Sequence, residues 1–205
     1  MLQSGKALLQ AVAERIVVRY LGSLPETETV PMEEVRALGQ GVDLAYVSRG
    51  LRKTVMVKPD VYFGADPAKA ADRMLPLYRG DLAICALQSV ADSTTHDPGW
   101  MLTSDADELF YYFLAIPQRE AEIRDILAAP DDSFFARLKV ERDDLLVFPM
   151  EATRAWFVAQ AERLQSRPIA LGGSSAWYRL APRVEIENAV RGASDHGPIF
   201  MTLAS

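Results

Sequence analysis

The sequence predicts an α/β fold in one domain, with a mixed central β-sheet flanked by helices. Three observations lead to this prediction. Residues 41–60 contain two short segments of alternating or β-branched apolar residues around a tight turn, which indicates a pair of strands. The almost wholly apolar run at 81–90 is typical of a strand that is buried on both faces. Later in the chain, apolar blocks alternate with helical patterns, as in a sheet with helices on both sides.

The composition is that of an ordinary folded domain. The chain has 205 residues, of which 49% are apolar and 24% are charged, so we expect a packed core and no extensive disorder. The net charge of −6 and the pI of about 5.0 argue against bulk electrostatic binding to nucleic acid, although a local basic groove stays open.

The location of the protein is predicted from its cysteine content and its N-terminal segment. The single cysteine, Cys85, cannot form an internal disulfide, and this indicates a reducing cytoplasm. Charged residues at Lys6, Glu14 and Arg15 interrupt the apolar N-terminal segment. We therefore expect neither a signal peptide nor a membrane span there.

The first sixty residues predict two helices and then two strands. A helical apolar pattern ends at Gly22, and a second, short helix opens at Pro31. Residues 25–30 between them are expected to form a polar loop. The strands are expected at 42–47 and 54–57, where the intervening residues break the apolar pattern.

The remainder of the chain predicts alternating elements. The apolar block at 109–116 is either a strand or a helix that passes into a strand, because periodicity alone does not decide between them. The other expected elements are a helix at 66–74, strands at 81–90 and 99–102, a helix at 117–129, a strand at 145–148, a long helix at 151–165, a strand at 176–180, a small helix at 182–190 and an edge strand in FMTLA at 200–204.

Several common catalytic motifs are absent from the sequence. It contains neither a phosphate-binding loop of the P-loop type, nor a dinucleotide-binding glycine pattern, nor the serine motif of a nucleophile elbow. His96 and His196 lie in polar segments without helical pairing, and with Cys85 in an apolar run they do not suggest a zinc site. The aromatic residues at 111–113 are expected in the core rather than as a platform for stacked bases.

One acid and one amine remain on neighbouring predicted strands. Asp43 lies near the start of the first strand, and Lys58 follows the end of the second. Asp60, Glu14 and Gln88 are the possible accessory residues. Asp43 and Lys58 could also form an ordinary cross-strand ion pair that has no catalytic role.

This arrangement resembles the PD-(D/E)XK nuclease superfamily, which has the restriction-endonuclease-like fold. The matching residues are Asp43 in GVDLAYVS and Lys58 in TVMVKPD, and the segments GWMLTSDADELFYYFLA and LLVFPMEATRAWF also look like those of some members. The resemblance covers about residues 5–165. It implies a single domain over 1–205, with a nuclease-like core and a C-terminal α/β extension at about 166–205.

The resemblance also implies a metal-dependent endonuclease that hydrolyses the phosphodiester bonds of DNA. Asp43 would be a ligand of Mg²⁺, and Lys58 would stabilise charge that develops on the phosphate. The family carries Glu or Asp two residues before this lysine, whereas this sequence has Met56. A thioether is a poor ligand for a hard cation.

Three interpretations of Met56 stay open. Another acid completes the site, with Asp60 or Glu14 as the best candidates and Gln88 as a further polar residue. Alternatively, the protein keeps the fold, has lost catalysis, and has a structural or regulatory role in binding another protein. In the third interpretation the resemblance is spurious. One more carboxylate within metal-bridging distance of Asp43 and Lys58 in an open cleft would favour catalysis, whereas a Met56 packed in a closed, carboxylate-poor pocket would oppose it. We also expect a homodimer, on base rates alone.

Overall fold

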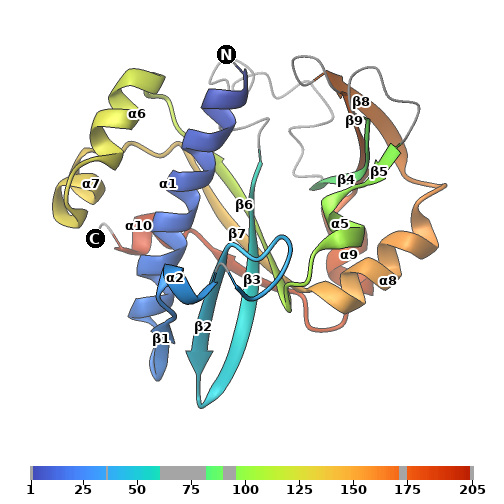
Figure 1. The fold of residues 1–205 in the computed structure, drawn as a ribbon, viewed down its shortest axis with the longest axis horizontal. Coiled ribbons are helices and arrows are strands. Elements are labelled where there is room, and N and C mark those ends of the chain that lie inside the picture. The colour runs from blue at the N-terminus through green and yellow to red at the C-terminus, as the bar shows by residue number, and fades with distance from the viewer. Residues whose placement is uncertain (1, 36, 61–81, 90–95, 171–174, 204–205) are drawn as a thin grey trace.

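The computed structural model describes residues 2–35, 37–60, 82–89, 96–170 and 175–203 (Figure 1). The mixed α/β class and the helices that flank a central mixed sheet are confirmed. The strands divide between two sheets, however, and not into the single sheet that the sequence predicted. The predicted helix at 66–74 lies outside the described residues.

The larger sheet has six strands in the order β1-β2-β3-β6-β7-β10. Their bounds are β1 Thr27–Thr29, β2 Leu44–Ser48, β3 Leu51–Pro59, β6 Glu108–Ala115, β7 Arg142–Pro149 and β10 Ser194–Gly197. β3 and β6 run parallel, with Val55 opposite Glu108, and the other neighbouring strands pair antiparallel. The predicted pair of strands is the β2–β3 hairpin. Positive φ angles at Arg49 and Gly50 suit its two-residue turn.

The block at 109–116, which the sequence left open between strand and helix, belongs to strand β6. All eight residues of β6 are buried because each face of the strand meets a different apolar cluster. Alternate residues such as Phe110 and Tyr112 lie under helix α1 (Leu2–Ser23), while Leu109 and Tyr111 face the second sheet. A strand between two cores is apolar at every position, and this removes the alternation by which strands are recognised.

The second sheet has four antiparallel strands in the order β5-β4-β9-β8. Their bounds are β4 Leu82–Ser89, β5 His96–Pro98, β8 Gln165–Ala170 and β9 Ser175–Ala181. The predicted apolar strand at 81–90 is β4, but it pairs with the distant β9 and not with the larger sheet. Residues after 164 therefore contribute strands to both sheets.

Helices pack against both sheets (Figure 1). Helix α1 lies across one face of the larger sheet, while α5, α8 and α9 lie on the side of the second sheet. The bounds of the remaining helices are α2 Met32–Val35, α5 Trp100–Thr103, α6 Glu120–Leu127, α7 Asp131–Arg137, α8 Met150–Gln160, α9 Arg183–Ala189 and α10 Ile199–Leu203. Of the helices described, none has the length and apolar character to cross a bilayer.

Three local predictions were wrong. The predicted strand at 99–102 is the short helix α5, and the predicted edge strand at 200–204 is helix α10, while β1 forms within the predicted loop at 25–30. Helix α10 forms because Asp143 on β7 accepts hydrogen bonds from the first helical N–H groups, at Ile199 and Met201. The edge of the larger sheet is taken instead by β10.

Asp143 should contribute strongly to stability, because its carboxylate also accepts the hydroxyl of the fully buried Tyr112 at 2.6 Å. We expect Asp143→Ala to lower the free energy of unfolding by about 2 kcal/mol, since a buried hydroxyl loses its acceptor. Urea unfolding measures this, with Glu162→Ala as the control at an exposed position, where the change should stay below about 0.5 kcal/mol. Equal losses in the two variants would contradict the structural role of Asp143.

Candidate functional site

Asp43 lies where strand β2 separates from β3. Its N–H continues the ladder by donating to the carbonyl of Val55 (2.9 Å). Its carboxylate Oδ2 then accepts a hydrogen bond from the N–H of Val57 at 2.8 Å. The carboxylate thereby replaces the backbone carbonyl that a longer β2 would have offered to Val57. The acid therefore pairs the backbone of β3 beyond the end of β2, which is a structural role that requires no catalysis.

Gln10 on helix α1 satisfies the other polar backbone group of Val57. Its Nε2 donates to the Val57 carbonyl at 2.9 Å and to Glu14 Oε1 at 2.8 Å. Glu14 thereby orients the Gln10 amide, and the pair attaches α1 to the edge of β3. Gln10 could not be recognised from the sequence, because its only signal is a Gln–Glu pair four residues apart on a helix, which is common.

Glu14, Asp43 and Lys58 form one electrostatic cluster, although they come from three different elements. Burial raises the pKa of Asp43, while the charge of Lys58 and the N–H of Val57 act to lower it. Burial also raises the pKa of Glu14, and the hydrogen bond from Gln10 acts to lower it. The negative charge of Asp43 raises this pKa further, whereas the positive charge of Lys58 acts to lower it. We call these three residues the Glu14–Asp43–Lys58 cluster.

Lys58 and Met56 lie on the side of β3 that faces the second sheet. Lys58 Nζ lies 5.7 Å from the centre of the Trp100 ring, on helix α5. Met56 is 2% exposed and belongs to the apolar cluster between the sheets. Its Cε packs so closely on Gly41 that a Cβ there would lie 2.6 Å away. Met56 therefore occupies a closed, apolar position.

The two other candidate residues have different surroundings. Asp60 is 2% exposed, and its Oδ2 accepts the hydroxyl of Tyr111 at 2.9 Å, so this carboxylate satisfies a buried polar group. Gln88 belongs to β4 of the second sheet, opposite Ala176, and its side chain lies outside the described part of the chain.

The donor set does not fit a tightly held metal ion. Among the side chains that the structure describes, no three histidine, cysteine, aspartate or glutamate residues are grouped to hold a metal. The Glu14–Asp43–Lys58 cluster offers two carboxylates, and one oxygen of each already accepts a hydrogen bond. Mg²⁺ requires octahedral oxygen coordination, so two such carboxylates would hold it weakly.

Comparisons with known proteins add no further indication. No family model, curated protein or solved structure matches the chain.

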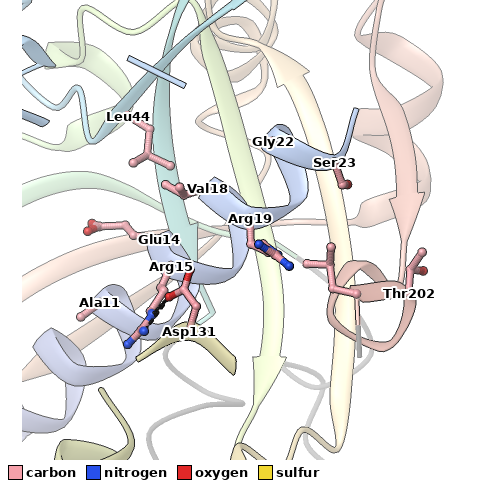
Figure 2. A pocket seen from close by; sticks show the side chains of 11 residues that line it. Ala11, Glu14, Arg15, Val18, Arg19, Gly22, Ser23, Leu44, Asp131 and Thr202 are labelled. Atoms are coloured by element: carbon pink, nitrogen blue, oxygen red, sulfur yellow. Dashed lines mark hydrogen bonds and ion pairs between the residues drawn. The ribbon is translucent and has the colours of Figure 1, made fainter. Parts of the chain in front are cut away.

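A groove of about 830 Å³ runs over the outer side of α1 and reaches Glu14 (Figure 2). Figure 2 shows Glu14 and Leu44 on one flank of the helix and Thr202 on the other. Arg15 lines the groove, but its guanidinium donates to Asp131 (2.6 and 2.8 Å) and to two carbonyl groups at the end of α6. The charge of Arg15 is therefore already compensated within the chain.

Two replacements of Asp43 should separate its hydrogen bond from its charge. Asp43→Ala leaves the N–H of Val57 without its acceptor, whereas Asp43→Asn keeps an oxygen in the same place. We expect the free energy of unfolding of the alanine variant to be lower than that of the asparagine variant by about 1–3 kcal/mol in urea titrations at neutral pH. Two variants of equal stability would show that the edge of β3 does not need this acceptor.

The raised pKa of Glu14 predicts a pH-dependent effect of Glu14→Gln. An acid with a raised pKa in the folded state favours folding when it is protonated, and this contribution is lost as the pH rises above its unfolded value of 4.5. Glutamine keeps the acceptor for Gln10 and carries no charge. We expect Glu14→Gln to be more stable than the wild type at neutral pH and equally stable at about pH 3.5. A less stable variant at neutral pH would show that Lys58 outweighs burial.

Proposed function

We propose that the chain is a nuclease-like protein that has lost metal-dependent catalysis and has a structural or regulatory role in binding another protein. The observation that carries this proposal is the burial of Met56 in the apolar cluster between the sheets. In the family that the sequence resembles, this position supplies a carboxylate to the metal. Here the side chain packs against Gly41 and contributes to the core.

The nuclease-like part of the proposal is supported by the order of the elements. Helix α1 precedes the β2–β3 hairpin; Asp43 lies immediately before β2, and Lys58 lies in β3. A parallel strand, β6, then lies against β3. One difference is that the apolar strand expected next, β4, lies in the second sheet.

A protein partner is favoured over nucleic acid by the distribution of positive charge. Phosphate binding requires uncompensated lysine and arginine side chains. Among the described residues, Arg15 is paired with Asp131, Lys53 with Glu108, and Arg183 with three carboxylates. With a net charge of −6, the chain has no overall positive charge to attract a polyanion. The proposal retains the homodimer and the reducing cytoplasm that the sequence led us to expect.

The second candidate function is Mg²⁺-dependent cleavage of DNA. The observation in its favour is the electrostatic coupling of Glu14 to Asp43 and Lys58. Glu14 would then be the second carboxylate of the site, in place of the acid that is missing at Met56. The groove over α1 also leaves Glu14 accessible from solvent.

Calorimetry with Mg²⁺ and Mn²⁺ distinguishes the two candidates. We expect no binding at sub-millimolar concentrations by the wild type, because two partly engaged carboxylates are too few ligands. Asp43→Ala should give the same result, and neither protein should cleave DNA. Sub-millimolar binding that is lost in Asp43→Ala would overturn the loss of catalysis and favour the nuclease.

Restoring the missing carboxylate tests whether the arrangement is nuclease-like at all. We expect Met56→Glu to gain Mn²⁺ binding and the double variant with Asp43→Ala to lose it, because the ligands would act together. Met56→Gln is the matched control, since it places a polar group of the same size in the same buried position without a charge. If a folded Met56→Glu gains no metal binding, the resemblance to the nuclease core fails, while the absence of catalysis stands.

A further inference from the structure

A hydrogen-bonded chain of three side chains lies near the C-terminal end of α1, away from the Glu14–Asp43–Lys58 cluster. Ser194 Oγ lies 2.9 Å from His196 Nε2, and Tyr20 Oη lies 2.6 Å from His196 Nδ1. The rings of Tyr20 and His196 meet edge to face, with centroids 5.9 Å apart. Both ring nitrogens of the histidine are therefore engaged, one by a hydroxyl that could act as a nucleophile and one by a fixed partner.

Strand β10 positions the serine and the histidine. The pairing of β10 with β7 shifts register between Asp195 and Gly197, and at this irregularity the side chains of Ser194 and His196 meet in their hydrogen bond. Between them, Asp195 accepts Arg183 Nη2 at 2.6 Å and the N–H of Gly197 at 2.8 Å, which anchors the strand. Ser194 and His196 are both exposed, so a small molecule can reach them.

The surroundings of His196 favour a neutral imidazole. The imidazole of His196 packs edge to face on Tyr20, and this partial desolvation lowers its pKa although the residue keeps a side open to solvent; the charges of Glu108 and Asp195 only partly oppose this. Glu108 is itself bound by Lys53 and by the hydroxyl of Tyr46 at 2.8 Å, which spreads its charge. At neutral pH the imidazole is then uncharged and able to accept a proton.

We propose that Ser194, His196 and Tyr20 form a site that hydrolyses small carboxylic esters. A nucleophile within hydrogen-bonding distance of a base, which is in turn oriented by a third group, is the arrangement that activates a serine. Ser194 is the nucleophile, His196 is the general base, and Tyr20 is a positioning residue. Strand β10 lies at the edge of the larger sheet, which leaves Ser194 and His196 open to a substrate.

The proposed reaction proceeds in two balanced steps. Ser194 Oγ attacks the ester carbonyl while its proton passes to His196 Nε2, and the bond to the alkoxide breaks as the alkoxide takes that proton. Water then attacks the acyl-serine and gives its proton to Nε2, which returns it to Ser194 Oγ as the carboxylic acid leaves. Both steps require that His196 carries its own proton on Nδ1 and donates it to Tyr20 Oη. The opposite tautomer would make Nε2 a donor to Ser194 and would leave the serine inactive.

A fluorophosphonate probe and p-nitrophenyl acetate test this site. We expect the probe to modify Ser194, located by mass spectrometry of peptides, and His196→Gln to slow both reactions about 100-fold. Ser166→Ala is the control, because Ser166 is an exposed serine on the edge strand β8 of the second sheet. Ester hydrolysis should be lost in Ser194→Ala and unchanged in Ser166→Ala. Modification of Ser194 no faster than that of Ser166 in the wild type would overturn the proposal.

The pH profile tests the role of Tyr20. The rate of ester hydrolysis should rise as His196 loses its proton, with a midpoint below the ordinary histidine value of 6.5. Tyr20→Phe removes the acceptor of the Nδ1 proton, so the imidazolium becomes less stable and the midpoint moves to lower pH. An unchanged midpoint in Tyr20→Phe would show that Tyr20 does not orient the base. Neither test depends on a metal ion, so both are independent of the function proposed above.

Discussion

The parallel pairing of β3 with β6 is the interaction on which the rest of the structure depends. It joins the N-terminal helix and hairpin to the remainder of the chain, and Asp107 strengthens it by accepting both the N–H and the hydroxyl of Thr54 at 2.8 Å. Both strands then lie between two apolar clusters. This central position explains Met56: a residue of β3 that faces the second sheet is buried, and an unpaired carboxylate there would be costly.

The sequence predicted those features that depend on neighbouring residues. The β2–β3 hairpin was recognised because its turn and its alternation are local. Its bounds were less accurate, because Asp43 lies just before β2 and Lys58 lies within β3. The assignment of β4 to a second sheet was not predictable, because its partner β9 lies far along the chain and an apolar run does not specify its partner. Helix α10 was mistaken for a strand because its capping acid, Asp143, is distant in sequence.

The candidate sites show the same limit. Glu14 was named as an accessory acid, but only the packing of α1 on the sheet shows its coupling to Asp43. The contact between Tyr20 and His196 joins residues 176 positions apart, and a serine two residues before a histidine is too common to be noticed. Asp43 has a structural role that a motif does not show: the resemblance makes this acid a metal ligand, but its carboxylate also accepts a backbone hydrogen bond from β3.

The packing of α10 against α1 has a consequence for the order in which the protein folds. Ile199 and Phe200 belong to the same apolar cluster as Val12 and Ile16 of α1, and Phe200 stacks on Phe135 with ring centroids 5.8 Å apart. During synthesis the first helix therefore emerges from the ribosome long before the residues that complete its packing. Strands β3, β6 and β7 can cover most of its apolar side earlier, but the part that meets α10 must stay uncovered, or be held by a chaperone, until Ile199 and Phe200 have been added.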